Sequence, residues 1–204
     1  MSDDDARRAA CAVALFRAAR RVRGTAGAFY LAMRGLRLPD ELEGAVVRFH
    51  PACPRQGARM PALIVLMRGV LDDEPRAVQR IFIGRDYAKA GKPMMLGLAG
   101  GAAMKLGRAG DRLHVCEGFE TGLALIAQGH APVWALGSAG GIARLPIVAG
   151  VRELVICADN DASWTGKKAA AAAMMTWGER ACAITVDRVG ADFADIARET
   201  MGRL

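Results

Sequence analysis

Three acidic residues stand where they could hold a metal ion together. Glu117 follows an apolar run that ends at Cys116, and Asp159 and Asp161 follow another apolar run about forty residues later. A spacing of two along extended backbone points both aspartates to the same side. Carboxylates that lie close together repel one another unless a cation sits among them, and such hard oxygen ligands suit Mg²⁺. The pattern favours a metal-dependent phosphoryl-transfer site, although a lone Asp-x-Asp is also common in solvated loops and helix caps.

Two further groups accompany these carboxylates. Lys167 and Lys168 open an expected helix, whose N-terminus can receive a phosphate. Asp192 and Asp195 follow the last expected strand, where they either contact the metal or cap the terminal helix.

The second half of the chain contains alternating strand and helix patterns that would position these groups. Strands are expected at 113–116, 133–136, 154–158 and 183–186, and helices at 120–128, 142–145 and 166–179. This alternation predicts an α/β fold with a mostly parallel sheet covered on both faces. If the first and third of these strands are neighbours, Glu117 lies one strand gap of about 5 Å from the two aspartates.

The first half has a different pattern. An amphipathic helix is expected over 5–22, ended by Gly24 and Thr25, and a shorter helix over 27–34, ended by Gly35. Short β-rich runs follow at 46–49, 62–68 and 78–83, with a turn at 72–75 between the last two, and the glycine-rich segment 97–110 reads as a connection. We therefore expect a small α+β subdomain over 1–110 and an α/β domain over 111–204.

The charge is distributed unevenly between these halves. The net charge is +7, and residues 1–110 carry 19 Lys and Arg against 10 Asp and Glu, whereas residues 111–204 carry 9 against 11. A basic half predicts a surface that binds a polyanion, although a basic surface without a binding role is an equally fair interpretation. Aromatic residues are only 5 %, so any nucleic acid would be held mainly through its phosphates.

The composition also bears on location. No apolar run approaches the roughly 20 residues of a membrane span, and the chain starts with acidic residues where a secretory signal would be basic. The five cysteines are scattered and form no CxxC pair, which argues against a disulfide framework. We expect a cytoplasmic protein.

Several segments resemble one known family. In the second half they are 114–124 (HVCEGFETGLA), 132–141 (PVWALGSAGG), 158–161 (ADND) and 192–195 (DFAD). This series resembles the Toprim domain of phage and plasmid primase-helicases. In the first half, 30–36 (YLAMRGL), 48–51 (RFHP), 61–68 and 89–97 (KAGKPMMLG) are similar, in order, to the catalytic core of DnaG-type bacterial primases.

The resemblance implies a fold, an activity and a set of site residues. The fold would be a Rossmann-like Toprim domain preceded by a small basic α+β subdomain. Glu117, Asp159 and Asp161 would be catalytic and would bind Mg²⁺ or Mn²⁺, with Asp192 and Asp195 as supporting metal ligands. The basic subdomain would hold single-stranded DNA template, with Arg68, Lys89 and Lys92 as candidates for template or nucleotide phosphate. The activity would be that of a DNA primase, a template-directed nucleotidyltransferase that makes short primers from nucleoside triphosphates.

This chain departs from the family pattern in places. Thr121 stands where DnaG-type primases carry an Asp after the Glu-Gly turn, and four residues separate Asp161 from Gly166 where a Gly usually follows closely. The zinc ribbon and helicase domains that usually accompany the family are not part of the sequence, so the chain is expected to be a catalytic core, a stand-alone remnant or one subunit of a split enzyme, with a separate helicase or zinc-ribbon subunit as a candidate partner. A Toprim nuclease and a non-catalytic nucleic-acid-binding module remain as alternatives. Trp164 is a further candidate for a nucleotide contact, and Tyr30 and Tyr87 are better read as structural than as topoisomerase nucleophiles.

Overall fold

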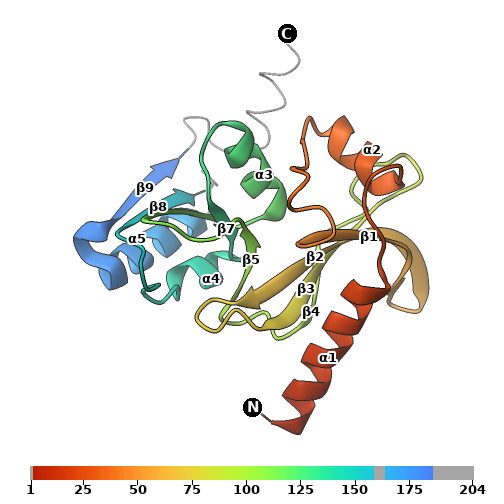
Figure 1. The fold of residues 1–204 in the computed structure, drawn as a ribbon, viewed down its shortest axis with the longest axis horizontal. Helices are drawn as coiled ribbons and strands as arrows, with labels where there is room; N and C mark the ends of the chain where they lie inside the picture. Colours follow the sequence, from red (N-terminus) through yellow and green to blue (C-terminus); the bar gives the residue numbers. More distant parts are fainter. Residues whose placement is uncertain (1, 159–163, 186–204) are drawn as a thin grey trace. The chain divides into compact units, whose positions relative to one another are not determined.

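The structure is a computed structural model that describes residues 2–158 and 164–185. It divides into two compact units, residues 1–102 and residues 103–204, which are drawn in Figure 1. Neither unit contains, in its described residues, a helix that is both long and apolar enough to cross a bilayer.

The first unit is built on an antiparallel sheet. Its strands are β1 (Val47–Arg55), β2 (Ala58–Gly69), β3 (Pro75–Phe82) and β4 (Met94–Gly97), and they pair in the order β1-β2-β3-β4. The expected hairpin between β2 and β3 is confirmed. β1 runs well past its expected end at residue 49, through Pro51 and Pro54. Proline is tolerated there because, after Phe49, the described residues that pair with β1 all belong to β2, and this pairing shifts between His50 and Cys53.

Helix α1 (Asp3–Ala18) begins and ends earlier than the sequence suggests. Ser2 caps its N-terminus by accepting a hydrogen bond from the Asp5 amide, and three aspartates in the first turn complement the helix dipole. The expected end at residue 22 is wrong because Ala19 is extended and Arg20 exchanges two backbone hydrogen bonds with Phe49 of β1. A tertiary pairing therefore ends the helix before its own glycine does.

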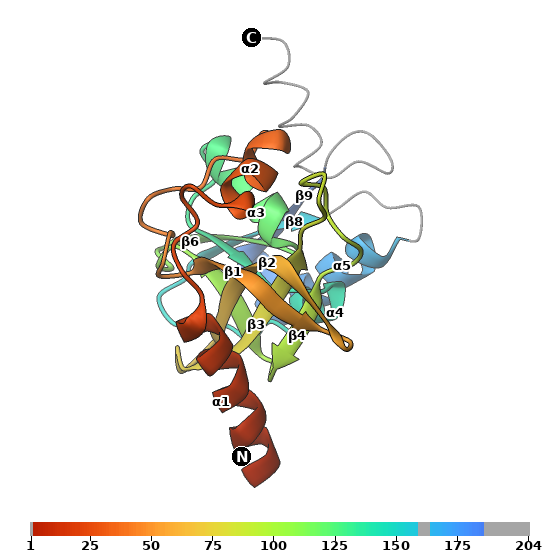
Figure 2. The same cartoon turned by 90° about the vertical axis from the view of Figure 1, so that its right-hand side faces the viewer.

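The two helices of this unit cover opposite faces of the sheet. Ala12 and Phe16 of α1 are buried against one face, in a cluster with Ile64 and other residues of β2 and β3, while the N-terminal turns run away from the sheet (Figure 2). Helix α2 (Ala26–Met33) lies on the other face, where a Cβ at Gly27 would come within 2.6 Å of Leu63. Ile64 and Leu63 are consecutive in β2, so their side chains point to opposite faces.

The second unit is the α/β domain that the alternating pattern predicts. Its elements are β5 (Ala102–Leu106), β6 (Arg112–Cys116), α3 (Phe119–Ala127), β7 (Val133–Ala135), α4 (Ala139–Ala143), β8 (Glu153–Ala158), α5 (Thr165–Trp177), a short 3₁₀ turn (Gly178–Arg180) and β9 (Ala181–Thr185). The strands pair in the order β5-β7-β6-β8-β9, and every pair is parallel except β5 with β7. A Rossmann-like, mostly parallel sheet with flanking helices is therefore confirmed.

Strand β5 corrects one expectation, because it lies within the segment that was read as a connection. Its sequence, Ala-Ala-Met-Lys-Leu, has little intrinsic strand preference. Pairing with β7 defines it instead. Lys105 lies opposite Trp134, with its ammonium 4.4 Å from the indole centroid, and the Trp134 Nε1 donates to the Gly107 carbonyl. These cross-strand contacts hold the lysine on the sheet.

The connections of the parallel strands determine which face of the sheet each helix covers and between which strands the direction of winding reverses. The chain leaves β6 through α3 toward β7 on one side, whereas it leaves β8 through α5 toward β9 on the other side. Right-handed crossovers therefore put α3 on one face of the sheet and α4 and α5 on the opposite face (Figure 1). Open sheets of this kind bind ligands at the carboxyl ends of the two strands where the direction of winding reverses. Here those strands are β6 and β8.

Candidate metal and nucleic-acid site

Glu117 lies at this point of reversal. It is the residue directly after β6, half-buried, and its carbonyl accepts a hydrogen bond from the Gly137 amide at 2.8 Å. The Cys116 carbonyl accepts from Leu136 at 2.9 Å, so the pairing with the β7 side continues past the end of both strands. The backbone of Glu117 is therefore held at the carboxyl edge of the sheet.

The turn that follows Glu117 leads directly into α3. Gly118 is the N-cap of this helix, and its carbonyl accepts from the Gly122 amide at 3.0 Å and from the Cys116 thiol at 3.4 Å. Glu120 and Thr121, in the first turn, are only 8 % and 4 % exposed. A carboxylate in the first turn is stabilised by the helix dipole. Glu120, three residues after Glu117, stands one place before the position at which DnaG-type primases carry their Asp, and its burial was not evident from the sequence.

Strand β8 ends at the same edge. It is the parallel neighbour of β6, with Val115 opposite Ile156, and it ends at Ala158, the residue before Asp159 in the sequence. The expected adjacency of the first and third strands is thus confirmed. Asp159, Asp161, Asp192 and Asp195 themselves lie outside the described residues, and the described part of the chain contains no cluster of three potential metal ligands.

The two lysines after β8 lie where the sequence predicts, in the first turn of α5. The helix begins after Trp164, whose backbone is left-handed (φ 60°) and whose carbonyl accepts from the Lys168 amide at 2.9 Å. The Lys167 ammonium lies 4.6 Å from the centroid of the Trp164 ring, while Lys168 is exposed. The indole is itself 61 % exposed, so this helix start presents two cationic side chains and an aromatic surface.

The three basic candidates of the first unit lie on two segments. Arg68 is near the end of β2, where its Nη1 donates to the Asp73 carbonyl at 2.9 Å and lies 3.8 Å from the Asp73 carboxylate. Lys89 and Lys92 lie between β3 and β4, with Lys89 half-buried and Lys92 exposed. The structure does not gather the three into one cluster. They form a dispersed basic surface of the kind that attracts a polyanion.

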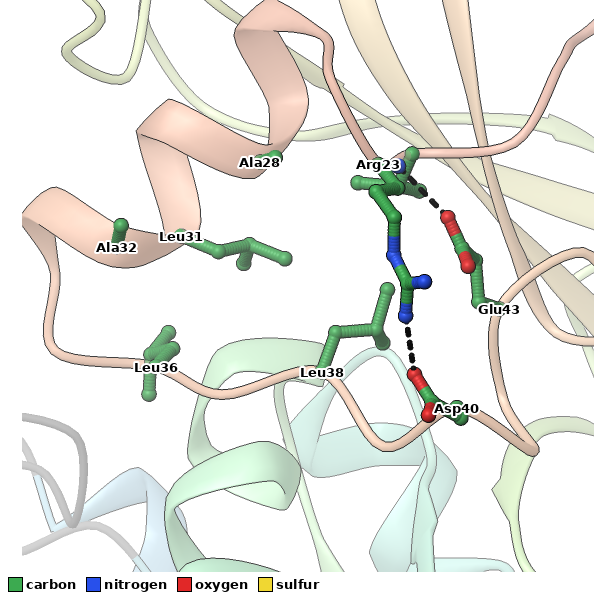
Figure 3. Close-up of a pocket in the computed structure, with 9 residues that line it drawn as sticks. Arg23, Ala28, Leu31, Ala32, Leu36, Leu38, Asp40 and Glu43 are labelled. Atoms are coloured by element: carbon green, nitrogen blue, oxygen red, sulfur yellow. Dashed lines mark hydrogen bonds and ion pairs between the residues drawn. The ribbon is translucent and has the colours of Figure 1, made fainter.

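One pocket of the first unit, drawn in Figure 3, is mainly apolar. It lies between α2 and the segment that follows it, has a volume of about 180 Å³, and is lined by aliphatic side chains such as Leu31, Leu36 and Leu38. Arg23 lies at its rim, with its guanidinium donating to Asp40 at 2.8 Å and its amide to Glu43 at 2.6 Å. This ion pair neutralises the rim, so the pocket offers no convergent charge for a nucleotide.

The remaining tryptophans and histidines of the second unit have structural positions. Trp134 and Trp177 are 3 % and 2 % exposed, so they pack in the core. His114 is buried within β6, with its ring 5.1 Å from that of His130. Desolvation, together with the nearby His130, lowers the pKa of His114 below its usual 6.5, so this histidine is neutral near pH 7.

The comparisons with known proteins agree with this geometry. Residues 112–202 match the family model of the Toprim domain, and residues 6–106 match that of a domain of unknown function, DUF7146. No curated protein sequence matches the chain.

Several solved structures of primase domains are similar to this chain. A DNA primase domain from Pseudomonas aeruginosa is 19 % identical with a TM-score of 0.63, and the match covers 94 % of this chain and 74 % of that one. The Escherichia coli primase catalytic core is 16 % identical with a TM-score of 0.63, covering 96 % and 75 %. A DnaG primase catalytic domain bound to single-stranded DNA is 15 % identical with a TM-score of 0.64, covering 97 % and 79 %.

These matches define the class of protein. The second unit is a Toprim domain, and the chain as a whole has the fold of a DnaG primase catalytic core. The Toprim family is thus shown for residues 112–202, and the likeness to DnaG primase cores, at 15–19 % identity, shows a shared fold, as the sequence motifs indicate.

Proposed function

We propose that this protein is a DNA primase core that synthesises short oligonucleotides on single-stranded DNA. The observation that carries the proposal is the adjacency of β6 and β8 at the point where the sheet reverses its winding. Glu117 follows one of these strands and Asp159 and Asp161 follow the other. Two sequence segments about forty residues apart would thus supply acids to the edge where such sheets bind ligands.

The donor set fits a hard divalent cation. Carboxylate oxygens are the ligands that Mg²⁺ and Mn²⁺ take in phosphoryl-transfer sites, so Glu117, Asp159 and Asp161 would hold the ion, with Asp192 and Asp195 as further ligands. A bound ion of this kind neutralises charge on the triphosphate and activates the attacking hydroxyl. The half-buried position of Glu117 restricts the approach of water, which strengthens the attraction between its carboxylate and a cation.

The basic first unit would bind the template. Its excess of arginine and lysine, including Arg68, Lys89 and Lys92, suits the phosphates of single-stranded DNA, and a similar primase domain is known bound to single-stranded DNA. Lys167 and Lys168 at the start of α5 would contact the phosphates of the incoming nucleoside triphosphate. In this proposal residues 1–110 form the template-binding subdomain and residues 111–204 the catalytic domain, acting in the cytoplasm.

Other subunits would complete the system. A similar structure, 15 % identical with a TM-score of 0.50, shows primase domains of bacteriophage T7 interacting with a lagging-strand DNA polymerase and bound to an RNA/DNA hybrid. By this analogy the present chain would act together with other replication proteins, and a separate helicase or zinc-ribbon subunit is our candidate for delivering the template.

The test is primer synthesis by the full chain on single-stranded DNA, with ribonucleotides or deoxyribonucleotides and Mg²⁺ or Mn²⁺. We expect short products from the wild type and none from Asp159→Asn/Asp161→Asn, with Asp3→Asn/Asp5→Asn on α1 as the charge-matched control. Synthesis that persists in the Asp159/Asp161 variant would overturn the assignment. Metal-dependent cleavage of the DNA without synthesis would instead identify a Toprim nuclease, and metal binding without either reaction a non-catalytic module.

A further inference from the structure

A second pocket of the first unit gathers arginines. It lies where the C-terminal half of α1 crosses the sheet and has a volume of about 290 Å³. Arg17 of α1, Arg48 of β1 and Arg68 of β2 all line it, and none of its lining residues is acidic. Three arginines lining one cavity give it an excess of positive charge, and an anion bound there would offset their mutual repulsion.

Arg48 is fixed in this pocket by its surroundings. Its Nε donates to the Gly44 carbonyl at 2.8 Å, and its Nη1 lies 3.5 Å and 3.4 Å from the carbonyl oxygens of Phe16 and Arg17 at the end of α1. The guanidinium also stacks 4.7 Å from the centroid of the Phe16 ring. Arginine has five N–H donors, so the two on Nη2 remain for a ligand. This residue is preorganised rather than mobile.

The other two arginines retain donors as well. Arg68 uses Nη1 for Asp73, which leaves Nε and Nη2, and the exposed side chain of Arg17 has no hydrogen-bond or ion-pair partner in the described part of the chain. The remaining wall is apolar, with Val13, Phe16 and Leu66. A planar guanidinium group binds phosphate bidentately. Guanidinium donors beside apolar side chains therefore suit a ligand in which a phosphate group is attached to a less polar part.

We infer that this three-arginine pocket is a phosphate-binding site that takes a phosphate group of a nucleotide, either free or within a single strand. The inference deepens the proposed function by adding Arg17 and Arg48 to the basic residues of the first unit, and it rests on that function for the nucleotide nature of the ligand. The pocket lies entirely within the first unit, so its binding can be measured without primer synthesis.

The experiment measures binding to the full chain in EDTA at low salt, with inorganic pyrophosphate, a ribonucleoside triphosphate and a single-stranded oligodeoxynucleotide as separate probes. Arg17→Gln and Arg68→Gln each remove a pocket guanidinium, and Arg8→Gln removes an exposed charge elsewhere on α1 as the matched control. We expect each pocket variant to weaken the preferred probe about tenfold, the loss of a charge-assisted hydrogen bond, and the control to change it by less than about twofold.

The pattern across probes identifies the source of the phosphate. Loss of triphosphate binding alone indicates a free nucleotide, and loss of oligonucleotide binding alone indicates a strand backbone; either outcome supports the pocket. Equal effects of the pocket variants and Arg8→Gln on all three probes would overturn it. Binding is measured in EDTA and therefore does not depend on metal chemistry. A protein that binds phosphate in this pocket but makes no primers in the separate assay with Mg²⁺ or Mn²⁺ would refute the proposed function and leave the pocket supported.

Discussion

The two units of this protein use strands in opposite ways. In the first unit the strands are antiparallel, so successive strand ends fall on alternate edges, and the basic residues spread over several segments. In the second unit β6, β7, β8 and β9 are parallel, so every carboxyl end falls on one edge. A parallel sheet therefore brings residues that are distant in sequence to one place, which a metal site requires. Binding a polyanion needs only a positive surface, and the antiparallel sheet is sufficient for that.

The charge follows the same division. The first half of the chain is strongly basic and the second slightly acidic. From this division of work we expect substitutions in the second unit to remove chemistry and leave binding, and substitutions in the first unit to weaken binding without changing the chemical step.

The largest expected effect comes from Glu117→Gln. The amide keeps the size of the side chain and removes the charge that would hold the cation, so we expect primer synthesis to fall by at least about 10²-fold. Binding of single-stranded DNA, measured by fluorescence anisotropy, should be unchanged. Asp111→Asn, at an exposed carboxylate before β6, is the control. Wild-type synthesis by the Glu117→Gln protein would contradict a role of Glu117 in the chemistry.

A smaller effect is expected for Gly97→Ala, which tests the packing of the first unit. Gly97 ends β4 with φ +93°, and a Cβ there would lie 2.4 Å from the Arg76 carbonyl oxygen and 2.8 Å from Ala12 of α1. We expect the free energy of unfolding to fall by about 2–3 kcal/mol, measured by urea denaturation, because backbone strain and a clash add. Gly100→Ala, where a Cβ meets open space, should change stability by less than about 1 kcal/mol.

The smallest effect is expected for single lysines of the basic surface. Lys92→Ala should weaken single-stranded DNA binding a few-fold and reduce the slope of log K against log salt by about 0.7, the value for one phosphate contact. Lys89→Ala should act in the same direction. Neither substitution should change the synthesis rate at saturating template. An affinity that does not depend on salt would contradict an electrostatic role for the first unit.

Much of the second unit could be predicted because its elements are locally encoded. The strand that ends at Cys116, the helix after Gly118 and the strand that ends at Ala158 were each visible as apolar runs bounded by glycine or acidic residues. Their adjacency could only be expected, because the order of strands depends on which faces pack together. The structure confirms it for β6 and β8.

Elements defined by tertiary partners were less predictable. The end of α1 follows from the pairing of Arg20 with Phe49, and β5 follows from the pairing of Lys105 with Trp134. The three-arginine pocket is of the same kind, since Arg17, Arg48 and Arg68 are separated by 31 and 20 residues in the sequence and meet only where α1 crosses the sheet.

The amino-acid sequence by itself determined the alternation of strands and helices, the basic first half, and the acidic residues that follow two of the apolar runs, because each of these depends on residue type and short spacing alone. The tertiary structure alone decided that β6 and β8 are neighbours at the point where the winding reverses, and that three arginines line one cavity. Such placements arise from the packing of side chains that are far apart along the chain, and no local pattern encodes them.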